Sequence, residues 1–271
     1  MILDFDPDGA VTPAARARAK ARLAQVAGED RIRVLLAVES GSRAWGFHSP
    51  DSDYDVRFLY VRGLDDYLSL EPPRDVVERP IVDDLDVGGW DLAKALKLAA
   101  KGNAVVSEWL TSPIVYDAVP GFREAVAPIV QAWRDRFGDV SHYLGLAHRQ
   151  WGAYVEGRER VRLKKYFYVI RPAACLQWLR DRGDEPMPMN LPALLEGLTL
   201  PAETAAALAD LRARKQAATE ALGEGPREPA LDAYAQEMLA WAMTAKAPRA
   251  RVRDAALWAR TEDLFRSWVK R

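Results

Sequence analysis

Polar residues suited to binding phosphates and metal ions lie close together in the segment VESGSRAWGFHSPDSDYDVRFLYV. Gly41 and Ser42 follow an apolar run, and Asp53 and Asp55 stand at the start of the next one. A Gly-Ser turn that opens a helix presents backbone amides and a hydroxyl to phosphate oxygens. Asp53 and Asp55 share one strand face, because strand side chains alternate, and can bind Mg²⁺ through oxygen. The segment therefore predicts a site for a triphosphate and a divalent metal ion.

A pair of metal ions about 3.5–4 Å apart needs a third carboxylate from a neighbouring strand. The weaker strand candidate 81–87 carries Asp84 and Asp86, which share a face, and it ends at the turn pair Gly88-Gly89. Either residue would complete the trio, and we prefer Asp86. Asp91 is better explained as the cap of the helix that follows.

Hydrophobic periodicity and cap residues predict the elements that position these groups. We expect a helix from Pro13 that ends before Gly28 and strands over 32–38 and 54–61. A further helix should run from 91 to about 100. Strand signals nearly vanish after residue 116, and a boundary near 118 divides the chain into domains 1–118 and 119–271. In the second part we expect helices from 163, over 201–222 and over 231–246, with the GEGPREP segment as a loop.

Composition limits the classes of protein to which the chain can belong. Of its 271 residues, 49% are hydrophobic and 28% are charged, which is typical of a globular protein. It has no apolar run near the roughly 20 residues of a membrane span, and acids stand where a secretory signal would carry bases. These features and the single cysteine, Cys175, predict a cytoplasmic protein. The net charge of −1 gives no global attraction to a polyanion, so nucleic-acid binding needs a local basic patch.

The spacing of the GS and DYD motifs resembles the signature of the DNA polymerase β-like nucleotidyltransferase superfamily. The strings GSRAWGF, DSDYDVR, WDLAKALKL, KGNAVVSEWL, SPIVY and KKYFYVIRP are similar to a subfamily of predicted nucleotidyltransferases that includes proteins linked to RNA repair. This resemblance implies an α+β chain, in which a mixed-sheet catalytic domain precedes an all-helical domain. It implies that Gly41 and Ser42 bind nucleotide phosphates, that Asp53 and Asp55 bind metal, and that Asp86 is the third ligand and the general base. The substrate would be an NTP, with Mg²⁺ as the cofactor and Mn²⁺ as its alternative.

A basic patch lies between Arg149 and Lys165, with six bases and two acids. The resemblance of KKYFYVIRP favours contact of Lys164, Lys165 and Arg171 with nucleotide or RNA phosphates. Tyr166 or Tyr168 could stack on a base, with core packing as the competing explanation. Arg43, beside the phosphate turn, is expected either to touch the triphosphate or to pair with Glu39 or an aspartate.

We therefore predict a metal-dependent enzyme that transfers a nucleoside monophosphate from an NTP to an acceptor hydroxyl. An RNA end, a protein side chain (as in antitoxin-type adenylyltransferases) and a small molecule all remain open as acceptors. The basic patch favours RNA. The rival hypothesis is a nucleotide-binding regulatory module without catalysis, against which the intact carboxylates argue. The sequence leaves the base preference and the oligomeric state open.

Overall fold

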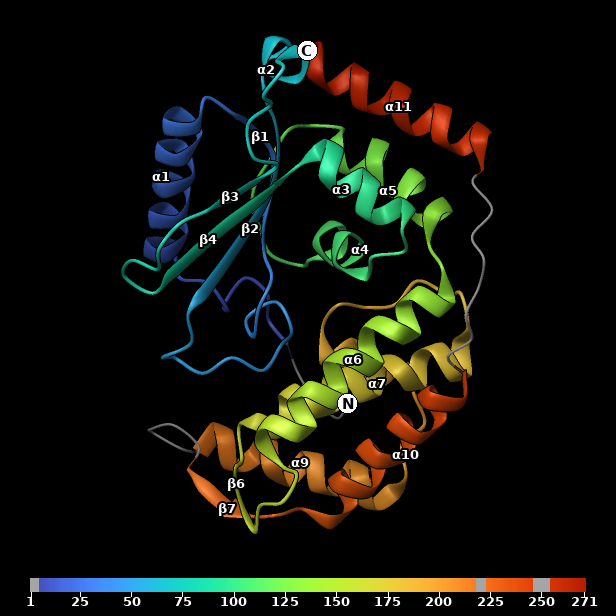
Figure 1. The fold of residues 1–271 in the computed structure, drawn as a ribbon. Helices are drawn as coiled ribbons and strands as arrows, with labels where there is room; N and C mark the ends of the chain where they lie inside the picture. Colours follow the sequence, from blue (N-terminus) through green and yellow to red (C-terminus); the bar gives the residue numbers. More distant parts are fainter. Residues whose placement is uncertain (1–4, 218–222, 246–253) are drawn as a thin grey trace. The chain divides into compact units, whose positions relative to one another are not determined.

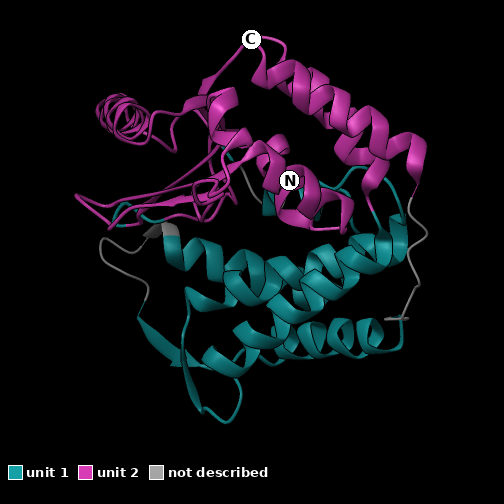
Figure 2. Cartoon of the chain, turned by 45° about the horizontal axis from the view of Figure 1, so that its top comes forward, with its two compact units in different colours: residues 1–5, 49–51, 135–249 teal, residues 6–48, 52–134, 250–271 magenta. Residues whose placement is uncertain are grey.

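The computed structural model describes residues 5–217, 223–245 and 254–271, which fold into two compact units (Figure 2). Both helices and strands are present, so the predicted α+β class is confirmed. We call the units the sheet unit and the helical unit. The sheet unit comprises residues 6–48, 52–134 and 250–271, and the helical unit comprises residues 1–5, 49–51 and 135–249.

A five-stranded mixed sheet forms the frame of the sheet unit (Figure 1). The strands lie in the order β3-β4-β2-β1-β5, with β2 and β4 parallel and the other neighbouring pairs antiparallel. The mixed sheet expected from the resemblance is thus present. The strands are β1 (Arg33–Glu39), β2 (Tyr54–Val61), β3 (Val76–Glu78), β4 (Leu85–Asp91) and β5 (Val115–Ala118).

The two strands predicted most clearly are the central ones. β1 is buried from Leu35 to its end, on both faces, which explains its continuous apolar run. β2 begins at the predicted residue, and its first half alternates between buried residues and the half-buried Asp55 and Arg57. This alternation directs a row of polar side chains to one face of the sheet.

The third predicted strand was displaced by several residues. β4 begins at Leu85, and Asp84 precedes it in a turn with a φ of 61°. Gly88 and Gly89 lie inside β4 instead of ending it. Gly89 is the register partner of Phe58 on β2, and a Cβ at Gly89 would overlap the Phe58 ring. The absence of a side chain at Gly89 therefore leaves space for the Phe58 ring. The prediction of a turn at Gly88-Gly89 was wrong.

Helices cover both faces of the sheet (Figure 1). On one side α1 packs against β1 and β5. On the other, β1 and β2 share a hydrophobic core with α3, α4, α5 and α11. The helices of this unit are α1 (Pro13–Asp30), α2 (Leu64–Leu68), α3 (Leu92–Ala100), α4 (Ala104–Thr111), α5 (Phe122–Trp133) and α11 (Ala255–Val269).

The final helix belongs to the sheet unit, although it lies far along the chain. Trp268 of α11 is buried and meets the Phe122 ring of α5 edge-on at a centroid distance of 5.0 Å. The division into these two units differs from the predicted domain boundary near residue 118. Both α5 and α11 lie beyond that residue but bury their apolar faces against the sheet.

Helix caps explain two other boundaries. The Thr12 hydroxyl accepts a hydrogen bond from the Ala15 amide, as expected of an N-cap, and Asp91 caps α3 through the Ala93 amide. The predicted end of α1 was wrong: the helix continues through Gly28 to Asp30, and Arg31 caps it in a left-handed conformation with φ 51°. Glycine lowers helix propensity by about 1 kcal/mol, which packing of the helix can offset.

The helical unit contains a small β-ribbon as well as helices (Figure 1). Residues 160–162 and the GEGPREP segment were not predicted as strands, yet they pair antiparallel as β6 and β7. Strands of three residues show too little alternation to be recognised, and this pairing joins segments far apart in the sequence. The elements are α6 (Arg136–Tyr154), β6 (Arg160–Arg162), α7 (Lys165–Arg182), α8 (Leu191–Glu196), α9 (Ala202–Ala217), β7 (Glu224–Pro226) and α10 (Pro229–Ala245).

The long helices of this unit follow the sequence predictions more closely. α7 buries Phe167, Ile170 and Ala174 and continues through Pro172. The predicted helices over 201–222 and 231–246 correspond to α9 and α10. The predicted ends of both, residues 218–222 and 246, lie outside the described residues.

The close packing of Gly89 against Phe58 gives a stability prediction. Gly89→Ala should lower the free energy of unfolding by about 1–3 kcal/mol, because the new methyl group overpacks the strand pair. Gly88→Ala is the matched control, since a Cβ there would meet its nearest neighbour at 3.7 Å, an ordinary contact. Chemical denaturation of both variants measures the difference, and equal stabilities would contradict the packing argument.

Candidate functional site

The Gly-Ser turn lies directly after β1. The Trp45 amide donates to the Gly41 carbonyl at 2.9 Å, and the Phe47 amide donates to the Ser42 carbonyl at 3.1 Å. These bonds close a single helix-like turn but no regular helix follows it, so the expectation that Gly41-Ser42 opens a helix was wrong. The turn still supplies the closely spaced backbone groups from which a phosphate-binding loop is made.

Gly41 is required by the carboxylate beside it. A Cβ at Gly41 would overlap the side chain of Asp55, so only glycine lets this turn lie against β2. The Ser40 amide also donates to the Asp55 carbonyl at 2.8 Å. The predicted phosphate turn and the predicted metal ligand are therefore in direct contact.

Asp55 and Asp86 are neighbours on parallel strands. They are register partners of β2 and β4, and their side chains are 29% and 31% exposed. Asp53 lies just before β2, and its negative charge, like that of Asp86, raises the pKa of Asp55. The structure thus brings the three predicted carboxylates to one end of the β2–β4 pair.

Arg57 is a cation among these acids that sequence reasoning missed. Its Nη2 atom lies 2.6 Å from Asp86 Oδ2 and 3.5 Å from Asp55 Oδ1. Its other terminal nitrogen donates to the Asp86 carbonyl at 2.8 Å. Two residues after Asp55 on the same strand, Arg57 shares its face, and that alternation was the signal available in the sequence.

Burial and charge compete at Asp55. Desolvation is the largest cause and raises the pKa of Asp55 to about 6, whereas Arg57 lowers it and Asp86 and Asp53 raise it further. Within the described residues, no three acid, histidine or cysteine side chains are gathered tightly enough to form a ready metal site. The guanidinium of Arg57 supplies the positive charge at this carboxylate pair.

The structure separates the two candidates for the third carboxylate. Asp84 lies in the turn before β4, where its half-exposed side chain pairs with Arg18 of α1 at 3.1 Å. Asp86 lies within β4, opposite Asp55. Asp86, and not Asp84, is therefore the carboxylate that lies beside Asp55.

Glu39 is a buried acid for which sequence reasoning considered only a pairing with Arg43. Its side chain is fully buried, accepting a hydrogen bond from the Tyr116 hydroxyl at 2.5 Å and another from the Asp55 amide at 2.9 Å. Burial raises the pKa of Glu39 to about 7, although both hydrogen bonds oppose the shift. An acid at the end of an apolar run was the signal for it. Glu39 ties the start of β2, and hence Asp55, to the end of β1.

Arg43 stabilises the loop between β1 and β2 through hydrogen bonds to backbone carbonyls. It is 4% exposed, and its guanidinium donates to the carbonyls of Ala10 at 2.7 Å and Ser52 at 2.6 Å. The guanidinium also lies 3.9 Å from the centroid of the Tyr54 ring. These contacts give Arg43 a structural role, which neither of the two predicted alternatives described.

The remaining predicted residues lie in the helical unit. Lys164 and Lys165 stand half-buried at the start of α7. Tyr166 is 1% exposed, and its hydroxyl donates to Asp232 at 2.9 Å, while Arg171 is 2% exposed and donates to the Met189 carbonyl at 3.0 Å. The predicted ligand contact of Arg171 therefore needs correction, and for Tyr166 the competing explanation, core packing, replaces stacking on a base.

Comparison with known proteins settles the family. Residues 15–267 match the family described as the RNA repair pathway DNA polymerase beta family. The chain belongs to this family. The resemblance to polymerase β-like nucleotidyltransferases is thereby confirmed, and with it a general transferase class.

Two individual proteins are similar to this family member. "Uncharacterized protein YcgL" of Bacillus subtilis (strain 168) is 43% identical over 190 residues, which are 70% of this chain and 72% of that protein. A crystal structure of a nucleotidyltransferase-like protein from Exiguobacterium sibiricum 255-15 is 11% identical with a TM-score of 0.28, and the match covers 85% of this chain and 75% of that one.

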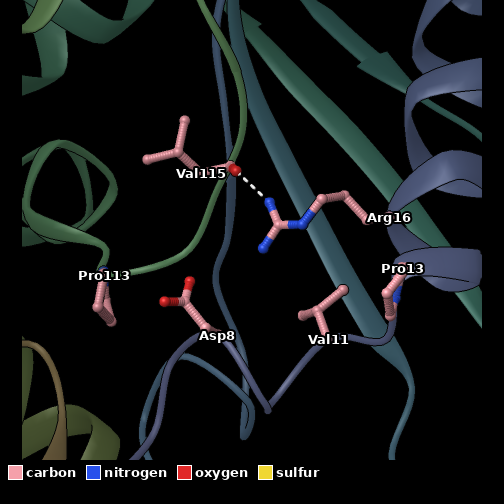
Figure 3. A pocket seen from close by; sticks show the side chains of 6 residues that line it. All are labelled: Asp8, Val11, Pro13, Arg16, Pro113 and Val115. Atoms are coloured by element: carbon pink, nitrogen blue, oxygen red, sulfur yellow. Dashed lines mark hydrogen bonds between the residues drawn. The ribbon is translucent and has the colours of Figure 1, made fainter.

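This member of the RNA repair pathway polymerase β family also has a cavity at the start of α1 (Figure 3). Its volume is about 420 Å³, and Arg16 reaches across it to donate to the Val115 carbonyl. The residues that line it are Asp8, Val11, Pro13, Arg16, Pro113 and Val115, and none of them is a predicted site residue. Among the described residues, no helix is both long enough and apolar enough to span a membrane.

The raised pKa of Glu39 gives a prediction for stability against pH. The folded protein holds this proton up to about pH 7, against 4.5 for an ordinary glutamate, so its stabilising contribution is lost as pH rises between these values. Glu39→Gln cannot lose a proton. Its Tm should therefore rise relative to that of the wild type by about 3 °C or more between pH 5 and pH 8.

Thermal unfolding followed by circular dichroism across this pH range measures the effect. Glu78→Gln is the control, because Glu78 carries an exposed carboxylate on β3. A constant difference in Tm between Glu39→Gln and the wild type would show that Glu39 does not titrate in this way.

Proposed function

We propose that this protein is a Mg²⁺-dependent enzyme that transfers a nucleoside monophosphate from an NTP to the hydroxyl of an RNA end. The observation that carries the proposal is the register pairing of Asp55 with Asp86, beside Asp53 and against the Gly41-Ser42 turn. A turn next to one member of a carboxylate pair would place phosphate oxygens beside metal ligands, as phosphoryl transfer with bound metal ions uses them.

The donor set fits a hard divalent cation. Asp53, Asp55 and Asp86 offer only oxygen ligands, and the raised pKa of Asp55 reflects in part the repulsion between neighbouring carboxylates. These three residues would hold Mg²⁺, or Mn²⁺ as its alternative, with the Arg57 guanidinium leaving Asp86. When bound, the metal would neutralise phosphate charge and lower the pKa of the attacking hydroxyl.

The protein groups would position the reactants and carry the proton. Backbone N–H groups of the Gly41-Ser42 turn and the Ser42 hydroxyl would hold the β- and γ-phosphates. The acceptor hydroxyl oxygen would bond to the α-phosphorus as the bond to the bridging oxygen breaks, and pyrophosphate would leave with that electron pair. The Asp86 carboxylate would accept the hydroxyl proton, and Arg57 would remain close enough to offset the charge that develops.

An RNA end is the acceptor that the observations favour. The family description places its members in an RNA repair pathway. Lys164 and Lys165 remain candidates for phosphate contact at the start of α7, which suits a polyanionic acceptor better than a neutral side chain.

The carboxylates give a direct activity prediction. Asp55→Asn and Asp86→Asn should each reduce pyrophosphate release by at least about 100-fold, because each removes a charge needed where the phosphates react. Asp84→Asn is the matched control: it makes the same change two residues away, in an exposed turn, and should leave the rate unchanged. The assay supplies each NTP in turn with Mg²⁺ and short RNAs of defined ends.

Two outcomes would contradict the proposal. Rates of Asp55→Asn and Asp86→Asn close to the wild type would remove the carboxylates from catalysis. Stabilisation by NTP with no pyrophosphate release from any acceptor would indicate a nucleotide-binding regulatory protein instead.

A further inference from the structure

A second cavity in the helical unit is lined by residues at the end of α6 and in the β6–β7 ribbon. Its volume is about 270 Å³. Of the described residues that line it, three are arginines and one is a glutamate. The lining residues are Ala153, Tyr154, Arg158, Arg160, Val161, Arg162 and Glu224. We call this cavity the arginine pocket.

The ribbon presents its arginines in a fixed arrangement. Val161 is 2% exposed, whereas Arg160 and Arg162 on either side of it are exposed, as strand alternation requires. The pairing of β6 with β7 anchors this short strand. Two guanidinium groups are therefore displayed on one face, two residues apart.

Backbone carbonyl groups orient two of the guanidinium groups without neutralising their charge. Arg158 donates to the Ala153 carbonyl at 3.0 Å, and Arg160 donates to the Glu224 carbonyl at 2.9 Å. A carbonyl oxygen fixes the direction of a guanidinium but leaves its positive charge in place, and its remaining N–H groups can bind an anion.

The acid in the pocket compensates little of this charge. The Glu224 carboxylate lies 3.8 Å from Arg162, and both side chains are more than half exposed. Exposed pairs of this kind contribute little energy and are screened by salt. The pocket therefore stays cationic.

An aromatic side chain stands beside these cations. Tyr154 lines the pocket, and its ring centroid lies 4.4 Å from the Lys165 ammonium. Lys165 in turn lies 4.6 Å from the Tyr168 ring. Because Lys165 lies over one face of the Tyr154 ring, a base would stack on the opposite face. Arginines for the phosphates next to an aromatic ring for a base are the combination that recognises single-stranded nucleic acid.

We infer that the arginine pocket binds the phosphate backbone of a single-stranded RNA, with Arg158, Arg160 and Arg162 on successive phosphates and Tyr154 against a base. The choice of RNA over the triphosphate of a nucleotide, which has the same chemistry, rests on the proposed function.

Binding of RNA across a salt series tests this inference. A fluorescent single-stranded 12-nucleotide RNA is titrated with full-length protein at several KCl concentrations, and anisotropy gives the Kd. Arg160→Gln combined with Arg162→Gln should weaken binding about tenfold or more at low salt. It should also reduce the slope of log K against log salt by about 1.4, because each phosphate that is no longer neutralised accounts for about 0.7.

Matched variants separate charge from folding. Arg266→Gln removes an exposed arginine of the sheet unit and should leave both affinity and slope unchanged. Arg160→Lys should retain most of the slope, because it keeps the charge. Circular dichroism of each variant confirms that it is folded.

Unchanged affinity and slope in the double variant would overturn the inference. Complete competition by millimolar ATP would also overturn it, and would assign the pocket to a nucleotide. The proposed function fails independently: if Asp86→Asn retains transfer while RNA binding depends on the arginines, the pocket stands without the reaction. If transfer requires Asp86 while RNA binding does not depend on the arginines, only the inference about the arginine pocket is contradicted.

Discussion

The parallel pairing of β2 with β4 is the constraint on which the candidate site depends. It places Asp55 opposite Asp86, and a slip of one residue would turn Asp86 to the other face of the sheet. The pairing is close only because Gly89 leaves room for the Phe58 ring. The core formed with α3, α4, α5 and α11 then covers the same sheet, so the register of one strand pair is stabilised by a core built from distant parts of the chain.

Electrostatic repulsion is the cost of this arrangement. Three aspartates, Asp53, Asp55 and Asp86, lie near one another at one end of the β2–β4 pair. A fourth acid, Glu39, is buried next to Asp55. Glu39 accepts a hydrogen bond from the Asp55 amide and so connects the ends of β1 and β2. The negative charge of the aspartates is offset by Arg57, whose guanidinium contacts both Asp55 and Asp86.

Local patterns predicted much of the fold and placed Asp55 and Asp86 on strands that the structure pairs. The strand from Tyr54 to Val61 and the cap at Asp91 were found because alternation and capping act over a few residues. Pairings between distant segments were missed, since three-residue strands such as β6 and β7 have no recognisable period. Gly89 was wrongly predicted as a turn residue, because the side chain that requires a glycine there, Phe58, lies on another strand. Core packing was the competing explanation for Tyr166, but nothing in the local sequence indicated the burial of Arg171, because its partner Met189 lies elsewhere in the helical unit.

The central claim is that Asp53, Asp55 and Asp86 form one metal-binding set beside the Gly41-Ser42 turn. A crystal structure of the protein with Mn²⁺ and a non-hydrolysable NTP tests it most directly, because manganese is located by its anomalous scattering. We predict a manganese peak between Asp55 and Asp86, with the Arg57 guanidinium moved away from Asp86 and the triphosphate at the turn. Manganese bound at Asp84 or elsewhere, with the ion pair of Arg57 and Asp86 intact, would contradict the account.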